Sequence, residues 1–200
     1  ANAYGHGLVE TAKIFMAAGA NWLAVNSVEE GQKLRESGFN QPILIIGYAA
    51  EAELAKILDL DLRLFVNNWP AAQKLSELGT KKNKKALIHL KIDTGMHRHG
   101  VLMAEAEELV KKIKELPNIK IEGLATHFAT SDEPLKPDYF NKQLENFKEA
   151  IIKIKNIIGS DLIVHCDKSA SLLLYRHDLA NLVRPGLAVY GYYPGPDTKK

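Results

Sequence analysis

The sequence is poor in cysteine, nearly balanced in charge and free of long apolar runs. Its 200 residues contain one cysteine, Cys166, so an internal disulfide is excluded and a reducing compartment such as the cytoplasm is expected. The formal net charge of +2 gives no electrostatic reason to expect nucleic acid as a partner. No apolar run approaches the roughly 20 residues that span a bilayer, so no membrane partner is expected.

The residues that are present form a regular alternation of two patterns. Hydrophobic residues make up 46% of the chain, which is ordinary for one globular domain with a substantial core. Longer segments with apolar residues at three- and four-residue steps predict amphipathic helices, and short β-branched apolar runs between them predict strands. The predicted strands cover residues 22–26, 43–47, 62–67, 86–92, 121–127, 161–165 and 182–184.

Several helix boundaries carry their own signals. Glycine or proline at the end of an amphipathic run predicts the end of a helix, and serine just before a run predicts its N-cap. The predicted ends are Gly19, Gly38, Gly79 and Pro117, and the predicted N-caps are Ser27 and Ser169.

Strict alternation of strands and helices predicts an α/β fold with parallel strands and helical crossovers. A (β/α)8 TIM barrel has eight strands, so the seven predicted here fit a barrel that lacks its first strand in this chain. The opening "ANAYGHG" is then the loop after that strand. The rival fold, a doubly wound open sheet, normally carries a glycine-rich dinucleotide fingerprint that is absent. We expect the barrel over residues 1–192 and the start of a linker over the Pro-, Gly- and Lys-rich residues 193–200.

The active site of such a barrel lies at the carboxyl ends of its strands. Polar residues of unusual types gather at the predicted ends, and they are Tyr4, Lys91, Asp93, Arg98, His127, His165, Ser169 and Arg184. A histidine or arginine at such a position can also be a purely structural hydrogen-bonding or ion-pairing residue. No HxH or HExxH spacing is present, so the sequence predicts no metal site.

The strand at residues 86–92 is the most informative. Its alternation puts Leu87, His89, Lys91 and Asp93 on one face, and the opposite face is entirely apolar and suited to packing on helices. The polar face therefore points into the predicted barrel. A lysine there is costly unless it is paired or chemically neutralised. The alternative is a lysine at the strand end that extends its charged group into solvent.

The segments "CDKSAS" and "VRPGLA" follow the last two predicted strands. Loops at these positions of a barrel often bind phosphate through backbone N–H groups. Ser169 could add its hydroxyl group, and Gly186 would allow a close approach of the backbone. An N-capping serine and an ordinary turn glycine explain the same residues equally well.

Taken together, "ANAYGHG", "KIDTGMHRHG", "THFATSDE" and "VRPGLAVYG" resemble the motifs of the alanine racemase family, in order and over nearly the whole chain. The resemblance implies an isomerase that interconverts L- and D-alanine by two-base proton transfer on a Schiff base of pyridoxal 5'-phosphate, and so supplies D-alanine for peptidoglycan. It implies a homodimer of the full-length protein. The lysine that binds the cofactor would stand just before Ala1, and the second base would be a tyrosine of a C-terminal domain. No catalytic base is therefore expected within the chain, and the piece alone is expected to be inactive.

The resemblance also implies the residues that hold the cofactor phosphate. Tyr4 matches the tyrosine that donates a hydrogen bond to the phosphate. Ser169 and the backbone of Gly186 and Leu187 would complete the phosphate cradle.

A second set of residues is implied around the cofactor ring. Arg184 matches the arginine that faces the pyridine nitrogen, with His165 supporting it, and His127 would lie against the ring. Lys91 matches a lysine that is often carbamylated in this family. The resulting anion would pair with Arg98, which contacts the phenolic oxygen of the cofactor.

The chain departs from the family pattern at three positions. Lys168 stands where asparagine is usual, and His97 and His99 replace small or apolar residues around the arginine. Three alternatives stay open: a racemase for serine or lysine, a non-catalytic single-domain protein that binds pyridoxal phosphate, and a barrel that only folds.

Overall fold

The computed structural model describes residues 1–199, which form two compact units. The first unit comprises residues 1–89 and 115–120, and the second comprises residues 90–114 together with the described chain from residue 121 onward. Lys200, the last residue of the predicted linker, lies outside the described residues. Within residues 1–199, no helix combines the length and the apolarity needed to cross a membrane.

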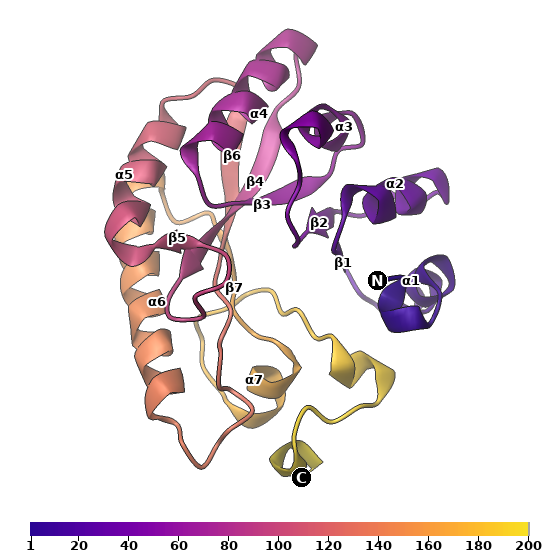
Figure 1. Cartoon of the computed structure of the whole chain (residues 1–200), viewed down its shortest axis with the longest axis vertical. Helices are drawn as coiled ribbons and strands as arrows, with labels where there is room; N and C mark the ends of the chain where they lie inside the picture. The colour runs from indigo at the N-terminus through magenta and orange to yellow at the C-terminus, as the bar shows by residue number, and fades with distance from the viewer. Residues whose placement is uncertain (200) are drawn as a thin grey trace. The chain divides into compact units, whose positions relative to one another are not determined.

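The first unit contains three short parallel strands and the helices that connect them, followed by the start of a longer strand (Figure 1). Its strands pair side by side in sequence order, with Leu23 opposite Ile43 and Ile45 opposite Leu64. Its elements are η1 (Ala3–Gly5), α1 (Leu8–Ala17), β1 (Leu23–Val25), α2 (Val28–Glu36), β2 (Ile43–Ile45), η2 (Glu51–Glu53), α3 (Leu54–Asp59), β3 (Arg63–Val66), α4 (Trp69–Lys82) and the first half of β4 (Ala86–Asp93).

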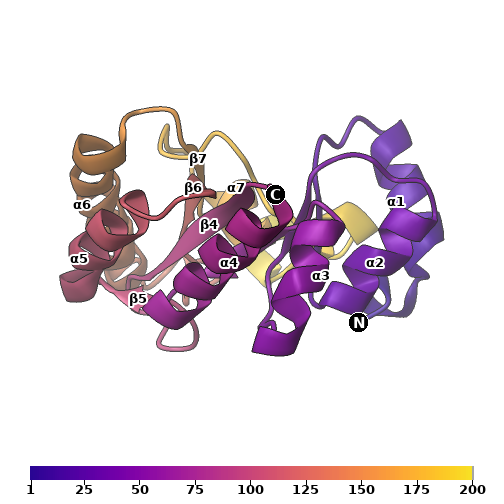
Figure 2. The same ribbon diagram turned by 90° about the horizontal axis from the view of Figure 1, so that it is seen from above.

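The second unit contains the end of β4 and the strands that follow it, apart from Ile119 and Lys120, which belong to the first unit. Its parallel pairs are β4 with β5 and β6 with β7, and helices α5 and α6 lie side by side in both ribbon views (Figures 1 and 2). Its further elements are β5 (Val101–Leu102), α5 (Met103–Lys114), β6 (Ile119–Ala125), α6 (Asp138–Ile158), β7 (Ile163–His165), α7 (Ser169–Leu174), η3 (Leu187–Tyr190) and η4 (Pro196–Lys199).

The strand order is β1-β2-β3-β4-β6-β7, with β5 paired to β4 at the side of this path. The principal strands thus follow one another in sequence order, with a helix between each pair of them. A doubly wound sheet reverses its strand order at a switch point, whereas a (β/α)8 barrel does not. The α/β class and the barrel-type succession of strands that the sequence predicts are confirmed.

The strand predicted at residues 182–184 is wrong. The segment follows β7, but its backbone makes only scattered bonds: Asn181 N–H donates to Val164 O at 3.0 Å, and Arg184 N–H donates to Asp167 O at 2.9 Å. The side-chain oxygen of Asn181 accepts from Val164 N–H at 2.8 Å, so a side chain occupies a group that a neighbouring strand would use. Pro185 then removes a backbone donor.

The predicted helix end at Gly79 is also wrong, because α4 continues to Lys82 and ends at the left-handed Asn83. Gly79 instead allows a close approach. A Cβ atom there would lie 2.7 Å from Lys84 O and 2.8 Å from Asn118 O. The glycine therefore lets α4 pack closely against the backbone of Lys84 and Asn118.

The opening segment forms the loop and helix start that its sequence predicts. Asn2, Ala3 and Tyr4 take left-handed φ angles of 46°, 53° and 57°, a conformation that costs a residue with a side chain about 1–2 kcal/mol. Two hydrogen bonds of Asn2 hold the turn: its N–H donates to Glu30 Oε1 at 2.7 Å, and its Oδ1 accepts from Leu8 N–H at 2.9 Å.

Candidate active site

The carboxyl ends of β4, β6 and β7 bring several of the predicted polar residues together in the second unit. Lys91 lies near the end of β4, His127 follows β6 by two residues, and His165 is the last residue of β7. Burial, followed by the charges of Arg184 and Arg98, lowers the pKa of His127 to about 3. His127 is therefore neutral at physiological pH in a strongly cationic environment.

Arg184 is held by the ends of two strands. Its Nη1 donates to His165 O at 2.8 Å and to His165 Nδ1 at 2.5 Å, and its Nη2 donates to Thr126 O at 2.8 Å. Because a guanidinium has no lone pair to offer, His165 Nδ1 must be the acceptor, and the neutral ring carries its proton on Nε2. Burial lowers the pKa of Arg184 to about 10, so the residue stays protonated at neutral pH.

Lys91 is buried, with 5% of its surface exposed. A lysine that reaches into solvent at the strand end is therefore the wrong interpretation. Burial is the main cause that lowers the pKa of Lys91 to about 8, and the charges of Arg98 and Arg184 add to it. At mildly alkaline pH the amino group of Lys91 is consequently uncharged in a sizeable fraction of the molecules.

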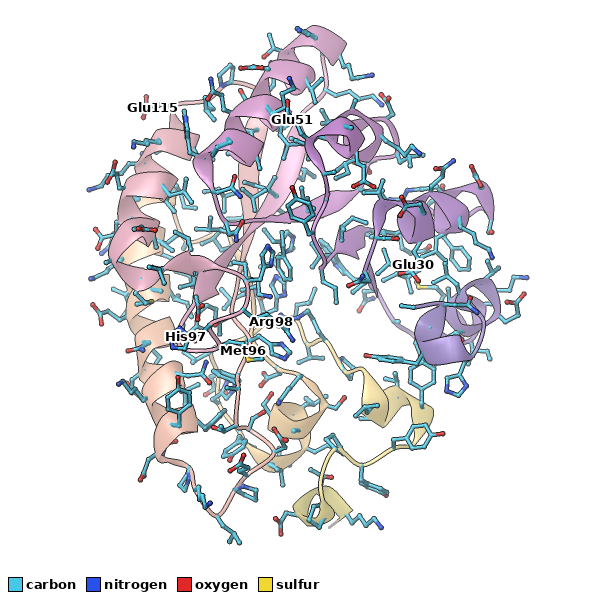
Figure 3. All side chains as sticks on the ribbon, viewed as in Figure 1. Glu30, Glu51, Met96, His97, Arg98 and Glu115 are labelled. Atoms are coloured by element: carbon cyan, nitrogen blue, oxygen red, sulfur yellow. The ribbon has the colours of Figure 1, made fainter. Side chains whose placement is uncertain are left out.

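The loop after β4 positions Arg98. Asp93 Oδ1 accepts from Gly95 N–H at 2.9 Å and from His97 N–H at 3.1 Å, which closes a tight turn. Figure 3 labels Arg98 and its neighbour His97 in this loop, and the side chain of His97 is 74% exposed. Gly100, at φ 154°, packs so closely that a Cβ would meet Asp93 N at 2.6 Å.

Ser169 links the turn after β7 to the segment before η3. Its Oγ accepts from Gly186 N–H at 2.9 Å and from Ala188 N–H at 3.1 Å. These bonds occupy both lone pairs of the oxygen, so the hydroxyl hydrogen remains to be donated elsewhere. The Gly186 N–H donates to Ser169. To bind phosphate, this N–H would have to give up its hydrogen bond to Ser169 Oγ and donate to a phosphate oxygen instead.

The prediction of Ser169 as an N-cap is wrong, because α7 begins at Ser169 and its N-cap is Lys168. Lys168 N–H donates to Ser171 Oγ at 2.9 Å. A serine inside the helix, rather than Ser169, therefore accepts the backbone N–H of the N-cap residue. The Lys168 side chain reaches Asp132 Oδ1 at 2.8 Å. Ser27, by contrast, accepts from Glu30 N–H at 3.4 Å as the predicted cap of α2.

Two further predicted residues complete the set. Tyr4 belongs to the first unit, where it lies in η1 with 67% of its surface exposed. Leu187 is the first residue of η3, directly after Gly186, and 43% of its surface is exposed.

Sequence reasoning missed a buried polar network beneath His127. Gln143 of α6 donates from Nε2 to Thr94 Oγ1 at 3.2 Å and to His127 O at 3.3 Å, and its Oε1 accepts from Ala129 N–H at 2.7 Å. Thr126 Oγ1 bonds to Thr94 Oγ1 at 2.8 Å. The available signal was Gln143 itself, a polar residue within the buried stripe of α6.

We expect the change Gln143→Leu to destabilise the protein by about 2–4 kcal/mol, because it leaves several buried groups without partners. The Lys142→Leu variant changes an exposed neighbour on the same helix and is expected to unfold close to the wild-type temperature. Thermal unfolding of the two full-length variants checks this. Equal midpoints for both variants would show that the network contributes nothing.

The family model described as alanine racemase, N-terminal domain, matches residues 1–194. This chain belongs to the alanine racemase family. The alanine racemase of Symbiobacterium thermophilum is 39% identical over 196 residues, which cover 98% of this chain and 52% of that protein. The alanine racemase of Methanococcus maripaludis is 40% identical over 196 residues, which cover 97% of this chain and 52% of that protein. The chain thus spans about half the length of the curated relatives it matches.

Solved alanine racemases share the fold. The structure of the Clostridium difficile enzyme in complex with cycloserine superposes with a TM-score of 0.95 at 34% identity and covers 100% of this chain and 55% of its own. The Bacillus anthracis enzyme with bound L-Ala-P superposes with a TM-score of 0.90 at 33% identity. The match covers 99% of this chain and 51% of that enzyme's chain. The chain therefore has the fold of the TIM-barrel-like N-terminal domain of alanine racemases.

Proposed function

We propose that the protein interconverts L- and D-alanine with pyridoxal 5'-phosphate as cofactor, and that this chain provides the barrel that binds it. The observation that carries the proposal is Arg184, a cation fixed between the ends of β6 and β7 near the neutral ring of His127. The proposal places the barrel at residues 1–192 and the start of a linker at residues 193–200. It also includes a cytoplasmic homodimer that supplies D-alanine for peptidoglycan.

The residues present suit an anionic, phosphorylated ring. Lys91, Arg98, Lys168 and Arg184 all act on the pKa of His127 in the same direction, so the cluster attracts anions. Ser169 has a hydroxyl hydrogen to donate to phosphate, with Gly186, Leu187 and Tyr4 as the further phosphate contacts proposed. The neutral ring of His127 provides a flat surface for contact with the ring of the cofactor.

When bound, pyridoxal phosphate withdraws electrons from the Cα atom of an amino acid and so weakens its C–H bond. The role of Arg184 is to limit that withdrawal. A guanidinium can donate a hydrogen bond to the pyridine nitrogen but does not release its proton near neutral pH. Arg184 would thus keep the pyridine nitrogen of a bound cofactor unprotonated, which would favour simple return of a proton to Cα over transamination or decarboxylation.

His165 holds Arg184 in this position. Its Nδ1 and its carbonyl oxygen both accept from the same guanidinium nitrogen, so the imidazole fixes the orientation of the head group. Lys91, as a carbamate anion, is proposed to orient Arg98 toward the phenolic oxygen in the same manner.

The proton-transferring groups are proposed to lie outside these residues. We propose that one of them is the lysine that binds the cofactor and the other a tyrosine of the C-terminal domain of the partner subunit. The substrate pocket would borrow residues from that domain, so serine and lysine are the competing substrates.

We expect the full-length protein to racemise alanine and the isolated 200-residue polypeptide not to do so. Each missing acid–base group contributes roughly 10²–10⁴-fold to such reactions, and solvent cannot replace both. Chiral chromatography of alanine, serine and lysine incubated with either protein and added cofactor measures this. Cofactor-dependent formation of D-alanine by the isolated polypeptide would contradict the proposal, because the proton-transferring groups would then lie within it. Racemisation of only serine or only lysine by the full-length protein would show that alanine is not its substrate.

A further inference from the structure

Three side chains that ligate metals in other proteins meet at the turn that follows β7. Cys166 and Asp167 come directly after the strand, and His177 comes from the segment after α7. One ligand atom from each lies within 4.8 Å of the other two. His177 Nε2 is 3.1 Å from Asp167 Oδ1, and Cys166 Sγ is 4.0 Å from Asp167 Oδ2.

The cluster is buried and incompletely satisfied. Cys166 is fully buried, Asp167 is 6% exposed, and the side chain of His177 is 9% exposed. Since a carboxylate only accepts hydrogen bonds, His177 Nε2 carries the ring proton in the present contact. The other nitrogen, Nδ1, is buried without a hydrogen-bond partner, and in the neutral ring it is the nitrogen that offers a lone pair.

We propose that Cys166, Asp167 and His177 form a binding site for one divalent cation of the zinc type. A mixed set of sulfur, nitrogen and oxygen ligands is typical of Zn²⁺, which prefers four ligands in tetrahedral arrangement, and a water molecule would fill the fourth position. One thiolate and one carboxylate supply two negative charges to the divalent ion, and the guanidinium of Arg184 also interacts with both groups.

Binding requires one proton to leave. The S–H bond of Cys166 breaks and an S–metal bond forms, with the proton released to solvent. The His177 imidazole ligates as the neutral base through one nitrogen and keeps its proton on the other. No oxidant or reductant takes part in this exchange.

The site is part of the framework that carries Ser169. Arg184 N–H donates to Asp167 O at 2.9 Å, and Lys168 and Ser169 follow Asp167 directly in the chain. A cation here ties the segment after α7 to the turn after β7. The inference rests on these contacts alone and does not depend on the proposed racemase activity.

Sequence patterns could not have found this site. Two of the ligands are adjacent and the third lies ten residues later, beyond a helix, which matches no standard metal spacing. The fold alone brings His177 back to the strand end.

The test is metal binding by the full-length protein after treatment with a chelator. Titration with Zn²⁺ alone, followed by calorimetry, is expected to show one ion per chain, and Co²⁺ in its place is expected to give the visible absorption of a tetrahedral thiolate complex. Cys166→Ser and His177→Gln should each weaken Zn²⁺ binding by at least about tenfold. Asp178→Asn, which changes an exposed carboxylate next to His177, should leave it intact.

A second measurement keeps the test decisive if Cys166→Ser fails to fold. X-ray absorption at the zinc edge of the unaltered protein is expected to show one sulfur at about 2.3 Å together with nitrogen and oxygen at about 2.0–2.2 Å. A shell of nitrogen and oxygen only, absence of stoichiometric binding, or binding that survives both ligand substitutions would overturn the proposal.

Discussion

Arg184→Glu in the full-length protein is expected to slow alanine racemisation by at least about a hundredfold and to divert part of the turnover to pyruvate. Arg184 now presents a fixed positive charge, with a pKa of about 10, at the ends of β6 and β7. A carboxylate in its place would favour the protonated form of the pyridine nitrogen, because an opposite charge nearby stabilises a cation. Stronger electron withdrawal would then lengthen the life of the deprotonated substrate and allow transamination.

The matched control is Arg184→Gln, which keeps an N–H donor but removes the charge. We expect this variant to be slower than the wild type and to form no pyruvate. Chiral analysis of alanine, a pyruvate assay and absorption spectra during turnover distinguish the two variants. If Arg184 merely links Thr126 to His165, both substitutions will lower the thermal midpoint and neither will change the products.

The second large effect is expected at Lys91. Carbamylation joins the uncharged Nζ atom to the carbon of CO₂: a C–N bond forms, one C–O π pair moves onto oxygen, and Nζ releases a proton. Because burial lowers the pKa of Lys91 to about 8, the reactive uncharged form grows as the pH rises through 8, far below the range of an ordinary lysine. The resulting anion would face Arg98 and Arg184, the cations that disfavour the ammonium form.

We therefore expect Lys91→Ala to lower activity by about 10- to 100-fold, the equivalent of one lost charged hydrogen bond of about 1.5–3 kcal/mol. Chloride or acetate should restore part of it. Lys91→Glu supplies a permanent carboxylate and should keep more activity than Lys91→Ala when bicarbonate is removed. Intact-mass measurement of the wild type should reveal the added CO₂. Full activity of Lys91→Ala without any added anion would contradict the carbamate.

Local sequence signals were sufficient for most of the barrel. The predicted strands at residues 22–26, 43–47, 62–67 and 86–92 correspond to β1 to β4, since each is a short apolar run between amphipathic helices. The wrong strand prediction arose where a contact between residues distant in the sequence determines the local backbone structure. Residues 182–184 are apolar enough for a strand, but the Asn181 side chain takes a backbone group of β7.

The candidate site was predictable only in part. The alternation in β4 identified Lys91 as inward-facing, and its burial agrees with that prediction. Neither the Gln143 network nor the cluster around Cys166 could be derived, because each joins residues that only the fold brings together. The two-residue strand β5 was too short to produce a pattern.

The most direct test of the proposed function is incubation of the full-length protein with L-alanine in D₂O, in the presence of pyridoxal phosphate. Proton transfer at Cα is expected to yield equal amounts of the two enantiomers, both with deuterium at Cα, as measured by chiral chromatography with mass spectrometry. L-alanine that keeps both its configuration and its Cα proton would contradict the assignment of this chain to an active alanine racemase.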